Sequence, residues 1–345
     1  METKRVRIDP HNIDSSSLKE AAELLRQGQL VALPTETVYG LGASALNPQA
    51  CKRIFEVKGR PQDNPLIVHI SDLAMAQKLV TNWSPQAEAC AAKFWPGPLT
   101  LVLEKTSLVP EVVSGGLKTV AIRMPKHPVA LELIRLAGVP VAAPSANLSG
   151  KPSPISGEHV WKDLKGKIPL ILDSGSCAVG VESTVLDLTG EIPTILRPGG
   201  ITKEELEEVL GEVGVDKPSG HQAPKAPGMK YRHYAPEGKL TIYEGDIENV
   251  VAVINREARK KMEAGFGTGI IATDETKNLY LCGMVKSVGS RKDETSIAAG
   301  LYNVLREFDE AHIEYIYSES FDDNSLGQAI MNRLLKAAGY CVVRV

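Results

Sequence analysis

Short apolar runs separated by turn residues dominate the chain up to about residue 215. Leu30–Leu33 predicts a buried strand, and the runs at 66–70, 99–103, 119–123, 139–143, 170–173, 184–188 and 194–197 predict further strands. Helical periodicity is confined to segments near 17–27, 47–58, 73–80, 84–94, 128–137 and 203–210. Many strands around few helices predict an α/β domain with a mixed, strongly curved sheet and flanking helices.

Two of these helices carry recognisable start signals. Ser17-Leu-Lys-Glu20 resembles a capping box, in which a serine and a glutamate bond each other's backbone N–H groups. Asn47-Pro48 predicts a cap followed by the first residue of the second helix. That helix extends by spacing to Lys58.

Beyond residue 238 the pattern becomes a regular alternation of strand and helix. The expected strands are 239–243, 268–273, 313–317 and 341–345, and the expected helices are 246–263, 295–309 and 326–338. This order predicts a small, Rossmann-like, doubly wound α/β domain with a largely parallel sheet. Gly267-Thr-Gly269 precedes its strand instead of following it, and no GxxxxGK[ST] loop occurs, so neither nucleotide-binding fingerprint is present.

A segment rich in proline and glycine separates the two patterns. We therefore predict a first domain at 1–215, a linker at 216–237 and a second domain at 238–345. Residues 1–215 have a net charge of −2 and residues 238–345 a net charge of −3, whereas the linker has a net charge of +2. The only net-basic segment of the chain is thus the joint between its halves.

Composition narrows the class of protein. A length of 345 residues suits two domains, and no apolar run is long enough to span a bilayer. The five cysteines are scattered without a CxxC pair, which fits a reducing cytoplasm and gives no metal signature. A net charge of −3 argues against a protein that coats nucleic acid.

The most informative stretch follows the first strand. Leu33-Pro-Thr-Glu-Thr-Val-Tyr-Gly-Leu-Gly-Ala43 crowds hydroxyl groups and a glutamate into a turn closed by Gly40 and Gly42. Backbone that can approach a ligand closely, lined by hydrogen-bonding side chains, is typical of a small-molecule site at the end of a strand.

Basic side chains stand at several strand–loop junctions. Lys58 and Arg60 lie on a turn fixed by Gly59 and prolines, where they either clamp phosphate oxygens or complement the end of the preceding helix. Arg123 ends a β run and needs either an acidic partner or an anionic ligand. Arg197 also ends a run, whereas His69 within its strand is either a core residue or a functional one.

These cations and hydroxyl groups form no serine–histidine–acid triad and no metal-ligand spacing. A site of this composition works by positioning and charge stabilisation, as in phosphoryl and nucleotidyl transfer.

The motifs in this order resemble the threonylcarbamoyl-AMP synthase family in its long form, a YrdC-like catalytic domain followed by a smaller domain. The matching segments are Pro34-Thr-Glu-Thr-Val-Tyr-Gly40, Lys58-x-Arg60, Asn64-Pro-Leu-Ile-Val-His69, Trp95-Pro-Gly-Pro-Leu-Thr100, Arg123-Met-Pro125, Ala143-Pro-Ser-Ala-Asn147, Gly180-Val-Glu-Ser-Thr184, Leu196-Arg-Pro-Gly199 and Ala226-Pro-Gly-Met-Lys-Tyr-x-His-Tyr-Ala-Pro236.

The resemblance implies synthesis of L-threonylcarbamoyladenylate and pyrophosphate from L-threonine, bicarbonate or CO2, and ATP. It places L-threonine against Thr37, His69, Arg123, the Ala143 backbone and Ser183. It places ATP against Arg60, Asn64, Thr119, Ser145, Ser153, Arg197 and Tyr234. It assigns catalysis to Lys58, Arg60 and Arg197, with Arg123 facing the threonine carboxylate and Lys58 near the phosphates.

The resemblance further implies Mg²⁺ bound with ATP and no metal bound by the protein itself. It implies downstream proteins that place the threonylcarbamoyl group on a tRNA adenosine, leaves direct contact with tRNA open, and fits a cytoplasmic protein without a membrane. We expect the linker 216–237 to close over the nucleotide as a lid, with Tyr234 touching ATP.

The alternative from another class is a double-stranded-RNA-binding module without turnover. Its basic groove would follow the phosphate backbone, but residues 1–215 have a net charge of −2.

Overall fold

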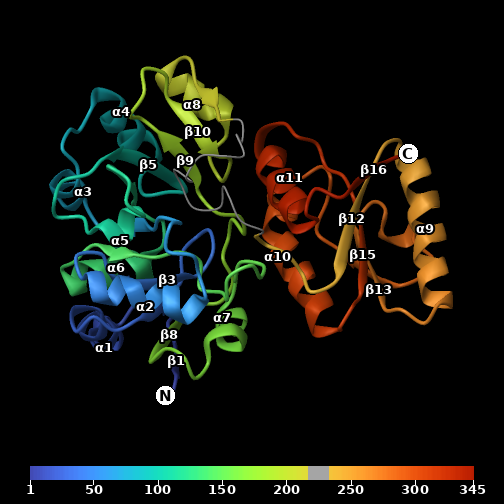
Figure 1. The fold of residues 1–345 in the computed structure, drawn as a ribbon, viewed down its shortest axis with the longest axis horizontal. Helices are drawn as coiled ribbons and strands as arrows, with labels where there is room; N and C mark the ends of the chain where they lie inside the picture. Colours follow the sequence, from blue (N-terminus) through green and yellow to red (C-terminus); the bar gives the residue numbers. More distant parts are fainter. Residues whose placement is uncertain (217–232) are drawn as a thin grey trace. The chain divides into compact units, whose positions relative to one another are not determined.

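The computed structural model describes residues 1–216 and 233–345, which fall into two units (Figure 1). The first contains Met1–Ser149, Ser153–Ala178 and the described residues from Glu182 to Asp216. The second contains Gly150–Pro152, Val179–Val181 and the described residues from His233 to Val345. Most of the predicted linker and lid, 216–237, lies outside the described residues.

The first unit contains every strand that the sequence predicts there, together with three that it does not. Its strands are β1 (Lys4–Arg7), β2 (Val31–Leu33), β3 (Gly40–Ser44), β4 (Ile67–His69), β5 (Leu99–Glu104), β6 (Thr119–Arg123), β7 (Val141–Ala142), β8 (Leu170–Asp173), β9 (Thr184–Asp187), β10 (Thr194–Arg197) and β11 (Gly214–Val215). The sequence analysis missed β1, β3 and β11.

All six predicted helices of this unit are present, and two further helices, α5 and α7, were not predicted. The helices are α1 (Ser15–Arg26), α2 (Pro48–Lys58), α3 (Leu73–Leu79), α4 (Pro85–Phe94), α5 (Glu111–Ser114), α6 (Pro128–Ala137), α7 (Gly157–Leu164) and α8 (Lys203–Leu210).

Capping explains where two of these helices begin. Asn47 caps α2 as predicted, with its side chain accepting from the N–H groups of Gln49 and Ala50. The predicted capping box at Ser17 is wrong, because α1 begins earlier and Asp14 caps it through the N–H of Ser16. Aspartate is as good a cap as serine, so the earlier residue starts the helix.

The strands form one mixed sheet, which confirms the predicted fold class. Their order is β1-β8-β2-β3-β7-β4-β6-β5-β9-β10-β11. The pairs β4–β6 and β5–β9 are parallel, whereas β2–β3, β5–β6 and β9–β10 are antiparallel. In the β4–β6 register His69 lies opposite Arg123, so two predicted site residues become neighbours.

Gly40 and Gly42 do not close a turn, as the sequence suggested, but belong to β3. A Cβ atom at Gly42 would lie 2.8 Å from the side chains of both Leu33 and Val141. The glycine therefore lets β3 fit between β2 and β7, and the small residues of this segment concealed a strand.

A buried apolar cluster packs α1 and α6 against the β2 and β8 side of the sheet. It includes Leu18, Leu25, Leu133, Ile134 and Leu172, all essentially inaccessible to solvent. This core fixes the strands whose ends carry the polar loops.

The second unit is a five-stranded sheet with α9 on one face and α10 and α11 on the other (Figure 1). Its elements are β12 (Lys239–Glu244), α9 (Ile247–Glu263), β13 (Thr268–Ala272), the 3₁₀ helix η1 (Lys277–Leu279), β14 (Met284–Ser287), α10 (Glu294–Glu310), β15 (Tyr315–Glu319), α11 (Ser325–Ala337) and β16 (Val342–Arg344). The strand order is β14-β13-β15-β12-β16, and every pair is parallel. This confirms the doubly wound prediction, which missed only β14 and η1.

Among the helices of the described ranges, none is both long and apolar enough to cross a membrane.

Candidate functional site

One face of the first unit's sheet carries an apolar strip with polar groups at both ends. Ile67, Val102, Ala121, Val185 and Leu196 form the strip, and each is buried. Side chains alternate across a strand, so the residues two positions along β4 and β6 share this face. Those residues are His69 and Arg123 at one end and Thr119 at the other.

At the first end, Arg123 is held by three neighbours. Its Nη1 donates to Thr37 Oγ1 at 2.9 Å and its Nε donates to the Gly97 carbonyl at 3.2 Å. Its Nη2 lies 2.7 Å from Oε2 of Glu36. The sequence analysis left open whether Arg123 has an acidic partner, and Glu36 is that partner.

The Glu36–Arg123 pair is buried but incompletely hydrogen-bonded. Three of its atoms make no well-aligned hydrogen bond, namely both carboxylate oxygens of Glu36 and Nη2 of Arg123. Burial alone would raise the pKa of Glu36, but the charge of Arg123 and the backbone N–H of Lys126 outweigh it, so this pKa lies below its usual value. Glu36 is therefore ionised at neutral pH.

Two neutral histidines flank this ion pair. Burial, and then the charge of Arg123, lower the pKa of His69 to about 3. Burial lowers the pKa of His127 to about 4, although Glu36 acts in the opposite direction. Nδ1 of each ring is buried without a hydrogen-bond partner. His69 is thus not a satisfied core histidine, and its free nitrogen is available to a ligand.

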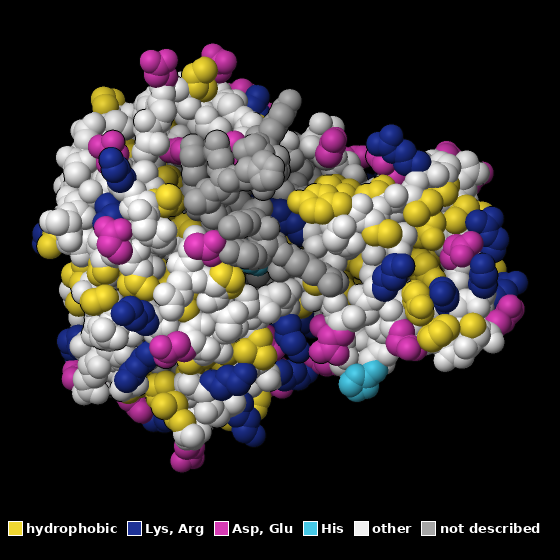
Figure 2. Space-filling view, viewed as in Figure 1, with side chains coloured by type: hydrophobic (Ala, Val, Ile, Leu, Met, Phe, Trp, Pro, Cys, Tyr) yellow, Lys and Arg dark blue, Asp and Glu magenta, His cyan; other side chains and the backbone are white. Residues whose placement is uncertain are grey.

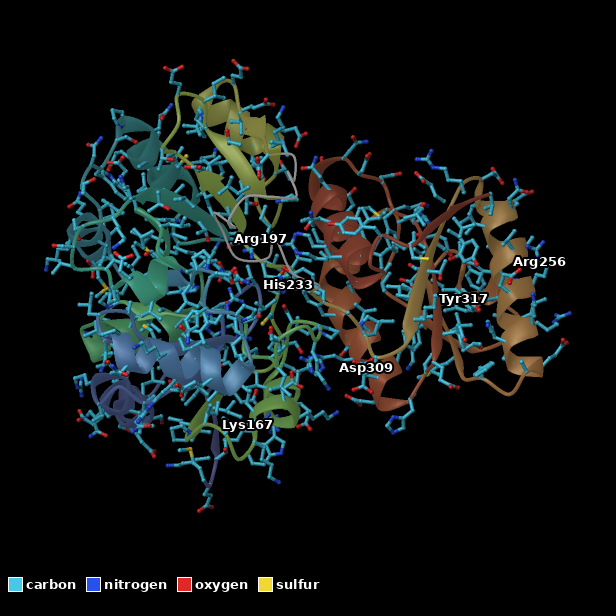
Figure 3. All side chains as sticks on the ribbon, in the orientation of Figure 1. Lys167, Arg197, His233, Arg256, Asp309 and Tyr317 are labelled. Carbon is cyan, nitrogen blue, oxygen red and sulfur yellow. The ribbon has the colours of Figure 1, made fainter. Side chains whose placement is uncertain are left out.

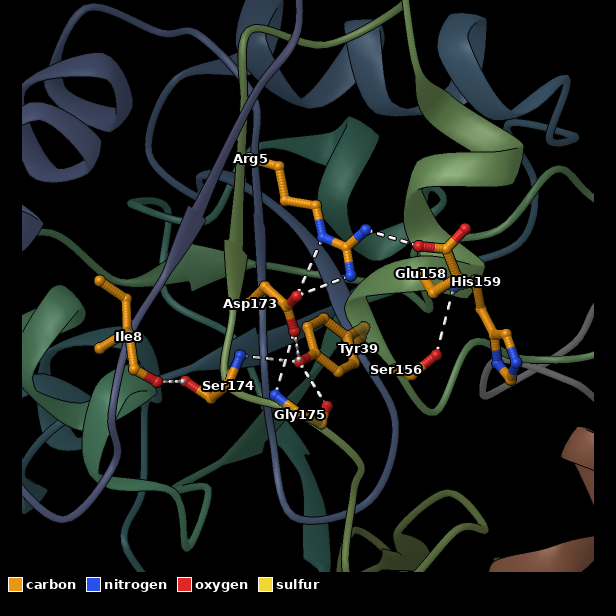
Figure 4. A network of polar contacts seen from close by, with 9 residues as sticks. All are labelled: Arg5, Ile8, Tyr39, Ser156, Glu158, His159, Asp173, Ser174 and Gly175. Carbon is orange, nitrogen blue, oxygen red and sulfur yellow. Dashed lines mark hydrogen bonds and ion pairs between the residues drawn. The ribbon is translucent and has the colours of Figure 1, made fainter.

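The loop that carries Thr37 and Glu36 is anchored at Tyr39 (Figure 4). The Tyr39 hydroxyl donates to the Gly175 carbonyl at 2.7 Å and accepts from the N–H of Ser174 at 3.0 Å. Asp173 lies 3.3 Å from the same hydroxyl and is paired with Arg5 at 2.8 Å. The polar stretch after β2 is therefore tied to the loop after β8, which fixes the position of Glu36.

Ser183 and Arg197 meet at the same end of the sheet. Ser183 Oγ lies 2.8 Å from Thr100 Oγ1. Arg197, at the end of β10 (Figure 3), donates from Nη2 to the Ser183 carbonyl at 2.9 Å and to Ser183 Oγ at 3.2 Å. A Cβ atom at Gly199 would lie 2.3 Å from the Ser183 carbonyl carbon, so only glycine lets these two loops approach so closely.

Lys58 is buried, and its ammonium group fixes a loop. Nζ donates to the carbonyls of Ser145 and Asn147 and, at 3.3 Å, to Asn147 Oδ1. Ser145 Oγ also bonds Asn147 Oδ1. In this structure Lys58 therefore orients Ser145, and this contact explains why a lysine ends α2 at a buried position.

Arg60 and Asn64 lie together on the turn between α2 and β4. Arg60 Nη2 donates to the Pro65 carbonyl at 3.0 Å and to the Asn64 carbonyl at 3.3 Å. Asn64 Oδ1 is buried without a partner. Thr119 begins β6, at the opposite end of that strand from Arg123, and the Ala143 N–H donates to the Ile67 carbonyl at 2.9 Å.

The two remaining predicted residues differ in their surroundings. Ser153 is buried in the first unit and donates to Glu182 Oε1 at 2.6 Å. Tyr234 belongs to the second unit, where its ring lies 5.4 Å from that of Tyr302 and 5.6 Å from the Arg333 guanidinium. The structure thus gathers twelve of the predicted residues in one unit and Tyr234 in the other.

Sequence reasoning gave no role to several residues that touch the predicted ones. These are Glu36, Thr100, Asn147 and Glu182. Nor did it give a role to His127, which interacts electrostatically with Glu36. A signal existed for Glu36, because a carboxylate in the most buried polar stretch of the chain needs a cation. His127 follows Arg123 by four residues across a proline, and its spacing carries no signal.

The second unit has a cavity of its own, of about 440 Å³, at the carboxyl ends of its strands. Its lining includes Glu275, Arg291 and Glu319. Arg291 Nη2 lies 2.5 Å from Glu319 Oε2 and donates to the Ser320 carbonyl at 3.0 Å, and the Tyr280 hydroxyl donates to Glu319 Oε1 at 2.7 Å.

Charged side chains of both signs alternate over the face of the molecule seen in Figure 2. The described residues on that face show no continuous basic stripe of the kind that a phosphate backbone requires.

Two family models match the chain. The model described as "Telomere recombination" matches residues 23–199, and the model described as "Threonylcarbamoyl-AMP synthase, C-terminal domain" matches residues 201–339. Together they account for both units.

Relatives match over the full length. The threonylcarbamoyl-AMP synthase of Bacillus subtilis is 50% identical, over 100% of both chains. That of Pyrococcus abyssi is 47% identical, over 96% of this chain and 97% of the relative. The crystal structure of P. abyssi Sua5 complexed with L-threonine superposes with a TM-score of 0.95 and 46% sequence identity. The match covers 99% of this chain and 100% of that one.

Proposed function

The chain belongs to the threonylcarbamoyl-AMP synthase family, and we propose that it makes L-threonylcarbamoyladenylate and pyrophosphate from L-threonine, bicarbonate or CO2, and ATP. The chain is thus an enzyme, a nucleotidyltransferase, and the alternative of an RNA-binding module without turnover is set aside.

One observation carries this proposal: the apolar strip ends in buried polar atoms whose hydrogen bonding is not completed within the chain. At one end the Nδ1 atoms of His69 and His127 have no hydrogen-bond partner, and Glu36 and Arg123 meet as an ion pair without a well-aligned hydrogen bond. Near the other end Asn64 Oδ1 has no partner. A buried polar atom without a partner costs about 1–3 kcal/mol, so several of them close together indicate a place where a ligand satisfies them.

The end at Arg123 suits a small zwitterion. Arg123 offers its guanidinium to the threonine carboxylate, and Thr37 and Ser183 offer hydroxyl groups nearby. His69, neutral at working pH, can accept a hydrogen bond at its free nitrogen, and we place the threonine hydroxyl there. Ala143 contributes backbone at the adjoining strand end. L-Threonine is the ligand named for the P. abyssi structure.

The other residues suit the nucleotide. We assign Arg60, Asn64, Thr119, Ser145, Ser153 and Arg197 to ATP, and we keep for Tyr234 the role that the resemblance implies. Arg60 and Arg197 supply positive charge that stabilises the phosphoryl oxygens as the carbamate oxygen attacks the α-phosphorus. Lys58 acts by holding the Ser145 loop.

We assign Mg²⁺ to the nucleotide, as part of the substrate, where it would offset the charge of the triphosphate.

The product would pass to cytoplasmic proteins that place the threonylcarbamoyl group on a tRNA adenosine. The product is a labile mixed anhydride that water hydrolyses, so an acceptor must take it up soon after it forms.

Pyrophosphate release measured with each substrate omitted in turn tests the proposal. We expect release that requires L-threonine, bicarbonate and ATP together. Release from ATP without threonine, or none with all three substrates present, would contradict it.

A further inference from the structure

Glu36 shares a buried pocket with Arg123, and the negative charge of one cancels the positive charge of the other. The guanidinium and the carboxylate lie 2.7 Å apart, and their side chains are 4% and 8% exposed. His69 and His127 add no charge at neutral pH. The pocket is thus neutral before any ligand arrives.

A carboxylate alone would upset this balance. If an incoming carboxylate binds Arg123 while Glu36 stays ionised, two buried anions share one cation, and like charges at such distances repel strongly. A second cation beside Glu36 restores neutrality. The groups that face Glu36 are Arg123 on β6, the N–H of Lys126, His127 at the start of α6, His69 on β4 and the Cys177 thiol after β8. Among these described groups only Arg123 is a cation.

A zwitterion supplies the missing cation itself. With its carboxylate on Arg123 and its α-ammonium beside Glu36, four charges alternate and the pocket stays neutral. Both Glu36 oxygens lack a well-aligned hydrogen bond, so each can accept an ammonium N–H.

Resting on the proposed function, we infer that Glu36 receives the α-ammonium group of the amino-acid substrate and takes its proton when the carbamate forms. Binding and proton transfer belong together, because the carboxylate that binds the ammonium is also the nearest base to it.

The proton transfer balances without a further reactant. An N–H bond of the ammonium breaks, and an O–H bond forms on Glu36. The nitrogen lone pair then attacks the carbon of bicarbonate, and the hydroxyl group leaves with a second nitrogen proton as water. Carbamate and protonated Glu36 remain, and Glu36 returns its proton to solvent after product leaves.

Ligand charge keeps Glu36 ready to act as a base with substrate bound. Arg123 holds the Glu36 carboxylate ionised against the effect of burial. When the substrate carboxylate shares Arg123, the α-ammonium beside Glu36 becomes its neighbouring cation. Once that ammonium gives up its proton the cation is gone, and burial then favours the protonated carboxyl, which drives the transfer.

Three ligands titrated into the wild-type chain by calorimetry test the binding role. They are L-threonine, its deamino analogue 3-hydroxybutanoate, which lacks the ammonium, and L-threoninamide, which lacks the carboxylate. We expect each analogue to bind at least about 30-fold more weakly, since each leaves one buried charge unpaired. Equal affinity of L-threonine and the deamino analogue would overturn the inference.

Glu36→Gln, with Glu23→Gln as the control, identifies the residue responsible. Glu23 is a half-exposed carboxylate of the same unit that pairs with Arg26 on α1. In Glu36→Gln we expect the preference for L-threonine over the deamino analogue to fall to within about threefold, whereas Glu23→Gln keeps it. A preference retained in Glu36→Gln would overturn the inference; Glu36→Asp, which keeps the charge, serves if Glu36→Gln fails to fold.

The pH dependence of pyrophosphate release at saturating L-threonine separates a base from a merely structural group. Without Glu36 the enzyme must draw on threonine whose amine is already neutral, so turnover of Glu36→Gln should rise about tenfold per pH unit relative to wild type below the amine pKa. Parallel profiles would overturn the proton role. A wild-type chain that releases no pyrophosphate with all substrates present would instead overturn the proposed function.

Discussion

Each unit of this protein contains an arginine–glutamate pair, and the two pairs differ in burial and in the hydrogen bonding of the carboxylate. In the second unit Glu319 accepts from Tyr280 on one oxygen and contacts Arg291 on the other; Arg291 is 32% exposed, and its Nε is buried without a hydrogen bond. In the first unit Arg123 and Glu36 are 4% and 8% exposed, yet Glu36 has no well-aligned hydrogen bond on either oxygen. A carboxylate whose hydrogen bonds are filled within the chain serves stability, whereas one left open costs stability and serves a ligand.

Removing Arg123 should have the largest effect, and it should fall on threonine. Arg123→Ala would delete the proposed contact to the threonine carboxylate and would leave Glu36 buried without its cation, so threonine binding should weaken by about 2–5 kcal/mol. ATP binding should change little. Separate titrations of the two ligands measure this, and an equal loss of both affinities would contradict the assignment of Arg123.

Removing the charge of Glu319 should affect stability instead. Glu319→Gln leaves Arg291 without its carboxylate and should lower the free energy of unfolding of the second unit by about 2–3 kcal/mol, less than a fully buried pair because Arg291 is partly exposed. Denaturant titration followed in the second unit measures the loss. Threonine affinity should stay within about twofold of wild type, because no group of the first pair is altered.

The two neutral histidines should make the first unit sensitive to acid. Their pKa values in the folded chain, about 3 for His69 and about 4 for His127, lie below the ordinary value of 6.5, so the unfolded chain binds more protons between pH 6.5 and 4. Stability should therefore be complete above pH 6.5 and fall with decreasing pH by about 1.4 kcal/mol per pH unit for each histidine. Urea unfolding at pH 7, 6 and 5 measures the slope.

Asparagine at both positions removes the titrating groups and provides the control. The double variant His69→Asn, His127→Asn should lose most of this slope between pH 6.5 and 4. An unchanged slope would assign the acid sensitivity to other groups.

The smallest expected effect concerns the hydroxyl that completes the second pair. Tyr280→Phe removes the hydrogen bond to Glu319 Oε1 and should cost about 1 kcal/mol of stability, with turnover unchanged. If this variant weakened threonine binding as much as Arg123→Ala does, the division between the two pairs would be wrong.

Much of the fold was predictable because buried strands and helices have characteristic patterns of apolar residues in the local sequence. Apolar runs marked the strands whose two faces are covered, such as β5 and β8, and the regular alternation after residue 238 marked the doubly wound unit. β3 escaped because its glycines fit between neighbours that only the folded sheet brings together. Asp14 displaced the expected cap at Ser17 because both residue types cap well, and sequence alone does not rank them.

The site was predictable as a set of residues but not as a set of partners. Motifs identified Arg123, Ser183 and Arg197, but their contacts depend on register between distant strands. The opposition of His69 and Arg123, for example, comes from the parallel pairing of β4 with β6. The engagement of Lys58 with the Ser145 loop is likewise a tertiary contact across 87 positions of sequence, which no local pattern records.

A matched pair of conservative variants tests the central claim most directly. Calorimetric titration of L-threonine into Arg123→Lys and Arg291→Lys removes the planar fork from each pair while keeping the charge. We predict that Arg123→Lys weakens threonine binding by about tenfold or more, since a bidentate contact is lost, and that Arg291→Lys binds threonine as wild type does. Equal affinities in the two variants would contradict the claim that the open pair of the first unit is the amino-acid site.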